Sequence, residues 1–163
     1  MPIAVGDRMP DVELARMRDG RVERITTGEL FGEGRSVLFA VPGAFTPTCT
    51  DAHLPGFQAR ADELAARGVD RIACVSVNDV FVMAAWGEDN EVGGTIEMLA
   101  DGNGELARAM GLEMDASRFG MGRRSRRYAA VVEDGVVQML GVEPAGGVEA
   151  SSAEAVLDWL RRS

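Results

Sequence analysis

The stretch SVLFAVPGAFTPTC, residues 36–49, decides the fold class that we expect for this chain. Its first six residues are apolar apart from Ser36, as is typical of a buried strand. A helical pattern follows over residues 57–64 and is closed by Gly68. Cys49 therefore lies where a strand, a proline-bounded loop and a helix start meet. The unpaired N–H groups and partial positive charge of a helix N-terminus favour an ionised thiol, so this position suits thiolate chemistry.

Turn residues and hydrophobic periodicity predict the other elements. Asp19-Gly20 and Asp134-Gly135 are hairpin turns by composition. We expect strands at 12–17, 21–25, 71–77, 95–100, 128–132 and 136–142. We expect a capped helical turn at 26–31, a helix at 80–88 capped by Asn78-Asp79, and a short helix that Asn103 caps and Gly111 ends. An irregular loop should follow at 113–125, and a capping box from Ser151 to Glu154 should open a final helix that continues through Leu160. Pro55 is expected to kink or break the helix that follows Cys49. The pattern predicts one α/β domain over residues 1–163, with a mixed sheet flanked by helices.

Composition excludes several classes of function. The chain has 163 residues, a net charge of −9 and only one histidine, and all 17 basic residues are arginine. The negative charge argues against nucleic acid or an anionic membrane as a partner. Without lysine there is no Schiff base and no phosphate-loop lysine, and one histidine with two cysteines argues against a zinc site. No metal or cofactor is expected.

The cysteine count and the N-terminal residues bear on the expected location. Two cysteines in a chain of this length do not make a disulfide framework. The first residues lack a basic start followed by an apolar stretch, and no apolar run is long enough to cross a membrane. We therefore expect a reducing, cytoplasmic location.

The spacing Pro42-x-x-x-Thr46-x-x-Cys49 resembles the active-site motif of the peroxiredoxins, which are thiol peroxidases with a thioredoxin-like fold. The full string PGAFTPTC, followed by HLPGF at 53–57, is similar to the type-5 or type-II subfamily. Further similar strings are VSVND at 75–79, FVM at 81–83, Trp86, ADG at 100–102, RSRRY at 124–128, VV at 131–132, DG at 134–135 and SSAE at 151–154. The resemblance covers nearly the whole chain. It implies a thioredoxin-like fold with an added N-terminal hairpin, a homodimer and no cofactor.

The resemblance also implies a role for each matching residue. Cys49 would be the peroxidatic cysteine, whose thiolate attacks a peroxide oxygen and becomes a sulfenic acid. Thr46 would hydrogen-bond the peroxide, and Pro42 would shield the sulfur. An arginine from a distant strand completes the site in such families. Its matching position here is Arg127, and Arg124 in the same basic cluster is the neighbouring candidate.

Two other residues leave alternatives open. His53, four residues after Cys49, is either a packing and supporting histidine or the base of a Cys–His nucleophile pair. No third residue that would orient its ring can be identified. Cys74, in an expected central strand, is either a small buried residue or a resolving cysteine that pairs with Cys49. Some type-5 members carry a late resolving cysteine where this chain has GGVEAS at 146–151.

We therefore expect a peroxidase that reduces hydrogen peroxide and alkyl hydroperoxides in antioxidant defence. External thiols, glutathione with glutaredoxin or else thioredoxin, are expected to regenerate Cys49. Two other classes remain open, a Cys–His acyl transferase and a redox-sensing interaction module that turns over slowly. Phe119 and Met121 either border the active site or contribute to a dimer contact.

Overall fold

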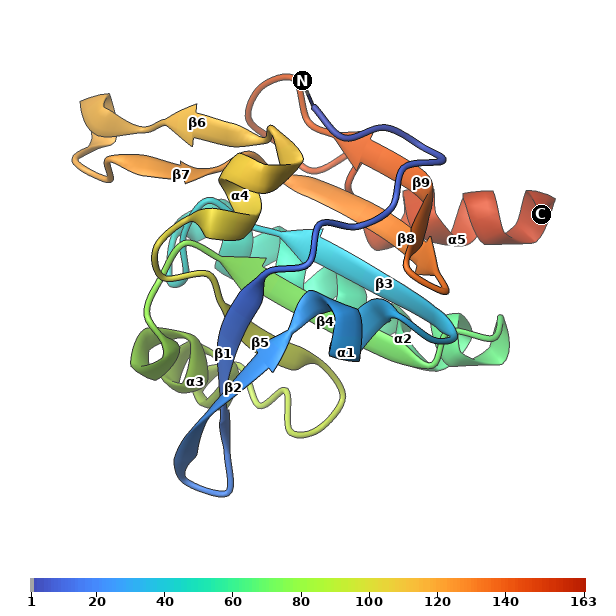
Figure 1. Cartoon of the computed structure of the whole chain (residues 1–163), viewed down its shortest axis with the longest axis horizontal. Helices are drawn as coiled ribbons and strands as arrows, with labels where there is room; N and C mark the ends of the chain where they lie inside the picture. The colour runs from blue at the N-terminus through green and yellow to red at the C-terminus, as the bar shows by residue number, and fades with distance from the viewer. Residues whose placement is uncertain (1) are drawn as a thin grey trace.

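The protein, described over residues 2–163 by a computed structural model, is built around a seven-stranded mixed sheet (Figure 1). The strand order is β2-β1-β5-β4-β3-β8-β9, and β3, β4 and β5 run parallel while every other neighbouring pair is antiparallel. The seven strands are β1 (Glu13–Arg18), β2 (Arg21–Thr26), β3 (Arg35–Ala40), β4 (Arg71–Ser76), β5 (Glu97–Ala100), β8 (Tyr128–Glu133) and β9 (Val136–Val142). The mixed sheet is the one that the sequence predicts.

Helices cover both faces of this sheet (Figure 1). They are α1 (Thr27–Phe31), α2 (Leu54–Ala66), α3 (Val80–Asp89), α4 (Glu105–Met110) and α5 (Ala153–Arg162). Alternation along β3 separates the two cores, as expected for a strand buried on both faces. Val37 and Phe39 pack with residues of α2, α3 and α5, whereas Leu38 and Ala40 pack with residues of α1 and α4.

The predicted hairpins are present at both ends of the chain. Asp19 and Gly20 have φ values of 53° and 76°, and Asp134 and Gly135 have 48° and 82°. Two successive positive φ values match the twist of the flanking strands in a two-residue hairpin. These short-range predictions are confirmed.

The predicted irregular loop at 113–125 is wrong. It contains β6 (Glu113–Asp115) and β7 (Arg123–Ser125), joined through a 3-10 turn (Ser117–Phe119). The ribbon extends away from the main sheet beside α4 (Figure 1). Each strand has only three residues and is largely polar, so neither shows the alternation by which a strand is recognised in sequence.

The predicted cap of α4 is also wrong. Gly104, not Asn103, precedes the helix, in a left-handed conformation. The carboxylate of Asp101 accepts hydrogen bonds from the N–H groups of Leu106 and Ala107, at 3.1 and 3.0 Å. Asp101 thus satisfies backbone N–H groups at the start of α4 that have no partner within the helix. Gly111 ends the helix as predicted.

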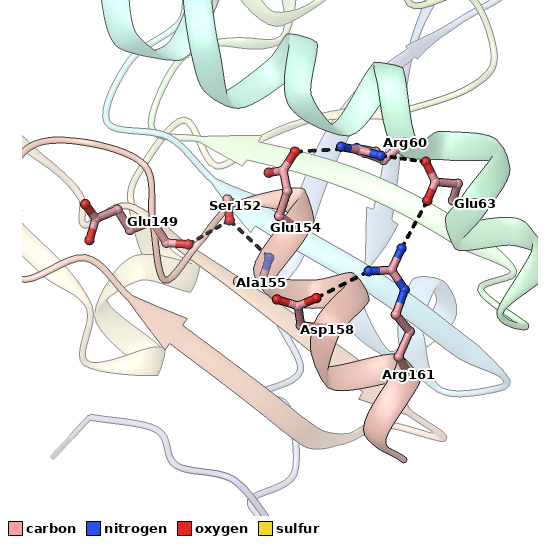
Figure 2. A network of polar contacts seen from close by, with 8 residues as sticks. All are labelled: Arg60, Glu63, Glu149, Ser152, Glu154, Ala155, Asp158 and Arg161. Atoms are coloured by element: carbon pink, nitrogen blue, oxygen red, sulfur yellow. Dashed lines mark hydrogen bonds and ion pairs between the residues drawn. The ribbon is translucent and has the colours of Figure 1, made fainter.

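The capping box expected at Ser151 is displaced by one residue. Ser152 precedes α5, and its hydroxyl accepts from the N–H of Ala155 at 3.1 Å and donates to the carbonyl of Glu149 at 2.7 Å (Figure 2). Ser151 is fully buried and makes different contacts. Two adjacent serines are equally good caps by composition, and only the packing distinguishes them.

No helix within residues 2–163 combines the length and the apolar character that a bilayer crossing requires.

Candidate active site

Cys49 lies near the start of a helix whose first turns are irregular. Pro47 begins the helical segment, as suits a residue without an N–H group. Residues Cys49–His53 form a π-helical turn, in which the N–H of Leu54 donates to the carbonyl of Cys49. Regular α2 geometry starts at Leu54, and Pro55 occupies its first turn. The helix therefore changes character next to Pro55, where the sequence predicts a kink or break.

Strand register brings Arg127 to this helix. In the antiparallel pairing of β3 with β8, Ala40 lies opposite Tyr128. Arg127 consequently lies just beyond the end of β3, where the loop leading to Cys49 begins. Its Nη2 donates a hydrogen bond to the Cys49 Sγ at 3.1 Å. Cys49 is completely buried and Arg127 is only 9% exposed, so this charge acts on the sulfur with little screening by water.

His53 contacts Arg127 rather than serving as a free base. Its Nδ1 lies 2.8 Å from the Arg127 Nη1, and its Nε2 lies 2.8 Å from the carbonyl oxygen of Ser151. A guanidinium can only donate and a carbonyl can only accept, so Nδ1 accepts and Nε2 carries the proton. Burial, reinforced by the charge of Arg127, lowers the pKa of His53 to about 4. The imidazole is therefore neutral at physiological pH.

Ser151 is the orienting residue that the sequence did not reveal. Its hydroxyl and its N–H both donate to the Glu143 Oε2, at 2.6 and 2.7 Å, and the N–H of Glu149 donates to the same oxygen at 2.8 Å. Burial raises the pKa of Glu143, but the hydrogen bonds from Ser151 and Glu149 outweigh it and the net direction is downward. The only sequence signal was an acidic residue directly after an apolar strand.

The loop before Cys49 is fixed by polar contacts. The Thr46 hydroxyl donates to the carbonyl of Gly43 at 2.6 Å, which leaves its oxygen lone pairs for another donor. The N–H of Ala44 donates to the Asn78 Oδ1 at 3.0 Å, and Ser76 donates to the same atom at 2.6 Å. The ends of β3 and β4 therefore hold this loop together.

Arg124 contacts the loop but makes no hydrogen bond to the sulfur within the described residues. Its Nη1 donates to the carbonyl of Pro42 at 3.3 Å, and its Nε donates to the carbonyl of Met121 at 2.9 Å. A Cβ at Gly43 would lie 2.8 Å from the Met121 Cε, so a larger residue there would displace the Met121 side chain. Arg124 thus joins the β6–β7 ribbon to the active-site loop.

Cys74 lies within β4, directly opposite Phe39 of β3, and is fully buried. Burial, and then the negative charge of an ionised Cys49, raise the pKa of its thiol well above the usual value. Both cysteines are free thiols. Within residues 2–163, no three His, Cys, Asp or Glu side chains are grouped so that they could hold a metal ion.

Comparisons with known proteins agree with this geometry. The family model for Redoxin matches residues 4–157. The chain is 54% identical to Peroxiredoxin-2E-2, chloroplastic, of Oryza sativa subsp. japonica, over 97% of this chain and 72% of that protein. It is 46% identical to Peroxiredoxin-2E, chloroplastic, of Arabidopsis thaliana, over 97% of this chain and 69% of that protein.

Solved structures are equally similar. The reduced Prx3 of Vibrio vulnificus in complex with H2O2 superposes with a TM-score of 0.93 at 49% identity, over 97% of this chain and 99% of that one. Peroxiredoxin 5 of Alvinella pompejana superposes with a TM-score of 0.88 at 36% identity, over 99% of this chain and 100% of that one. The predicted thioredoxin-like fold is confirmed.

The predicted cytoplasmic location is contradicted by the relatives. The rice and Arabidopsis proteins, at 54% and 46% identity, are both chloroplastic. The prediction came from the cysteine count and the N-terminal residues, and the cysteine count reports on redox chemistry and not on the compartment to which a chain is directed.

A thiol peroxidase needs a buried cysteine beside a fixed cation, and Cys49 with Arg127 provides that arrangement. The residues that match the peroxiredoxin motif by sequence lie in one place in the fold, and the relatives share that fold over nearly their full solved chains. The chain belongs to the Redoxin family and, within it, is a peroxiredoxin of the type-II or peroxiredoxin-5 kind, a thiol-dependent peroxidase.

Proposed function

We propose that Cys49 is the peroxidatic cysteine and that it reduces hydrogen peroxide and alkyl hydroperoxides in antioxidant defence. The contact of 3.1 Å between the Arg127 Nη2 and the Cys49 Sγ carries this proposal. The thiolate attacks the terminal peroxide oxygen, the S–O bond forms as the O–O bond breaks, and the leaving alkoxide or hydroxide takes up a proton. Cys49 becomes a sulfenic acid. The complex of the Vibrio vulnificus relative with H2O2 supports this choice of substrate.

Arg127 acts mainly on the peroxide. A thiol with a lower pKa is more often ionised, but its thiolate is also less nucleophilic, with a Brønsted slope of about 0.45. The two effects largely cancel, so ionisation supplies only a small part of an enzymatic acceleration of about a millionfold. The remainder comes from orienting the peroxide and stabilising the departing oxygen. Arg127 is a buried cation held directly beside the sulfur, and it can do both.

Thr46, Pro42 and Arg124 support the same step. The Thr46 hydroxyl gives its proton to Gly43, so its oxygen is available as an acceptor for the peroxide O–H. Pro42 limits solvent access to the sulfur. Arg124 donates to the Pro42 carbonyl and keeps the loop closed over the site.

An external thiol, glutathione with glutaredoxin or else thioredoxin, reduces the sulfenic acid and releases water. Cys74 is a structural residue in this scheme because it is fully buried in a central strand. The raised pKa of its thiol leaves it mostly protonated and a poor nucleophile toward Cys49.

Mass spectrometry after one equivalent of H2O2, with and without glutathione, tests this scheme. We expect a sulfenic acid at Cys49 alone, and a mixed disulfide at Cys49 when glutathione is present. The control variant C74S should turn over with glutathione and glutaredoxin at the wild-type rate. An internal disulfide between Cys49 and Cys74, or loss of turnover in C74S, contradicts the scheme.

The Cys–His acyl transferase is disfavoured by the contacts of His53. Both ring nitrogens are used, one by Arg127 and one by Ser151, so neither is available to take a proton from Cys49. Absence of ester hydrolysis by the wild type checks this. Steady-state peroxide consumption distinguishes a peroxidase from a redox-sensing module, because a sensing module would not sustain turnover with a thiol donor.

We also propose that residues 1–163 form one thioredoxin-like domain and that the chain is a homodimer. Phe45, Phe81 and Phe119 are 50%, 65% and 65% exposed, more than large apolar side chains usually are. Phe45 belongs to the active-site loop, and Phe119 belongs to the turn of the β6–β7 ribbon that Arg124 joins to it. Light scattering should give twice the monomer mass, and F119E should shift it toward the monomer.

A further inference from the structure

We propose that Glu143 is a positioning residue for peroxide reduction, acting through Ser151 and His53 to hold Arg127 against the Cys49 sulfur. The proposal rests on the proposed function of Cys49. It adds Glu143, which lies outside the strings similar to the subfamily, and gives a role to Ser151, the first residue of the SSAE string.

The first step is the placement of Glu143 beside Arg127. In the β8–β9 hairpin, Tyr128 lies opposite Val142, so Glu143, the residue after β9, is brought alongside Arg127, the residue before β8. The Glu143 N–H donates to the Arg127 carbonyl at 3.0 Å. The backbone of Glu143 therefore steadies the backbone of Arg127 directly.

The second step is the carboxylate itself. A buried charge is costly unless its lone pairs are satisfied, and Glu143 is only 6% exposed. One of its oxygens, Oε2, accepts three hydrogen bonds, two from Ser151 and one from the N–H of Glu149. This single atom fixes the direction of the chain from 149 to 151 and so the direction of the Ser151 carbonyl.

His53 links the Ser151 carbonyl to the guanidinium of Arg127. The Ser151 oxygen holds the proton of His53 on Nε2, which leaves Nδ1 as an acceptor for the Arg127 Nη1. The guanidinium is then held at one nitrogen, so its other terminal nitrogen, Nη2, is aimed at the sulfur. A histidine in the other tautomer would present a donor to a donor and push Arg127 away.

The rings around His53 keep it in this orientation. Its centroid lies 4.9 Å from that of Phe39 and 5.6 Å from that of Phe57, and the two phenylalanines stack at 4.2 Å. Packing restrains the position of the ring, whereas the proton on Nε2 depends on the carbonyl that Glu143 positions. Loss of Glu143 should therefore alter the tautomer before it alters the packing.

Stopped-flow measurement of Cys49 oxidation by H2O2 tests the proposal. E143A should lower the second-order rate constant at least about tenfold, because small errors in placement at a reacting centre have large kinetic effects. E143Q keeps an accepting oxygen and should lose only about threefold. The matched control is E149Q, which neutralises an exposed carboxylate in the same segment and should react as the wild type does.

A second control separates positioning from stability. S152A removes the cap of α5 and should lower the thermal midpoint by about 3 °C with no change in the peroxide rate. In an R127M background, E143A should have no further effect on the rate, because Glu143 acts through Arg127. A full additional loss in that background would overturn the proposal.

The single histidine of the chain provides a readout that does not depend on activity. In a spectrum of 15N-histidine-labelled protein, the wild type should show the neutral tautomer protonated at Nε2 from pH 5 to 8. The charged groups acting on the ring are Arg127 and Glu143. E143A should show mixed tautomers, and the pKa of His53 should stay below the ordinary value of about 6.5, because burial and Arg127 still lower it and the lost carboxylate is a charge that raises it.

The outcomes distinguish the two levels of the proposal. A wild-type rate no faster than that of free cysteine defeats the function proposed for Cys49, and this inference with it. A fast wild type with E143A equal to E149Q, or an unchanged histidine spectrum in E143A, defeats the inference alone. If E143A does not fold, E143Q takes its place in the test. A threefold lower rate constant and an altered histidine spectrum in E143Q would support the inference. A rate constant equal to that of E149Q would overturn it.

Discussion

Two consecutive serines belong to two different polar networks, one buried and one exposed. Ser151 is fully buried and donates to Glu143, at the beginning of the chain of contacts that ends at Cys49. Ser152 caps α5, whose charged side chains reach across to α2 (Figure 2). The backbone hardly separates the two residues, so the contrast lies in their surroundings.

The exposed network consists of ion pairs within and between α2 and α5 (Figure 2). Arg60 lies 3.4 Å from Glu154 and 2.8 Å from Glu63, and Arg161 lies 3.3 Å from both Glu63 and Asp158. Every one of these side chains is at least 39% exposed. Water and salt screen such pairs, and the side chains lose conformational entropy to form them.

The buried network has fewer charges but more consequence. Arg127, His53 and Glu143 are each at most 9% exposed, and each contact restricts the next by donor and acceptor identity. A lost partner in this network cannot be replaced readily by water. Burial, and not the number of ion pairs, therefore decides which polar contacts hold the groups around the Cys49 sulfur.

The largest expected effect comes from the end of the buried network. R127M should lower the rate of peroxide reduction by about a hundredfold to a thousandfold, because it removes the cation that stabilises the departing oxygen. Stopped-flow oxidation by H2O2 measures this rate, and alkylation by iodoacetamide as a function of pH measures the thiolate fraction. A peroxide rate that falls only in step with the thiolate fraction would contradict the prediction.

A smaller effect is expected from the pH dependence of folding. Because the folded pKa of His53 is about 4 and the unfolded value is about 6.5, only the unfolded chain gains this proton as pH falls between them. The free energy of unfolding should therefore decrease from pH 6.5 to pH 4, by about 3 kcal/mol from this group. Urea unfolding of the wild type and of H53Q isolates the term, since glutamine does not titrate. Parallel pH profiles of the two proteins would refute it.

The smallest effect is expected from the exposed network. R161Q removes both ion pairs of Arg161 and should lower the thermal midpoint by no more than about 2 °C in low salt. In 1 M salt the difference should disappear, and the peroxide rate should be unchanged at either ionic strength. A loss of activity in R161Q would contradict this prediction, because the side-chain partners of Arg161 are Glu63 and Asp158 and neither belongs to the buried network.

Much of the fold is predictable because its signals are local. The turns Asp19-Gly20 and Asp134-Gly135 specify their hairpins by backbone conformation alone, and the apolar run at 71–77 specifies the central strand β4. The β6–β7 ribbon escaped prediction because three-residue polar strands have no periodicity. The cap expected at Ser151 is formed by the adjacent Ser152, whereas the donors at the start of α4 are satisfied by Asp101 and not by Asn103.

Some residues of the candidate site are likewise predictable from the sequence, and others are not. Cys49 was identified from its place between a strand and a helix, and Arg127 came from resemblance to a family and not from local pattern. Glu143 and Ser151 carried no local signal, since an acid after a strand and a serine before a helix are ordinary features of many chains. Ser151 contacts Glu143 over an interval of 8 residues and His53 over an interval of 98 residues.

The amino-acid sequence by itself determined the turns, the alternation of strands and helices and the place of Cys49 between a strand and a helix, because each depends on residues within a few positions of one another. The tertiary structure decided which distant side chains meet that thiol. Antiparallel register places Arg127 at the end of β3 and Glu143 beside Arg127. Burial then makes their hydrogen bonds specific, since an enclosed donor or acceptor must find a partner inside the protein.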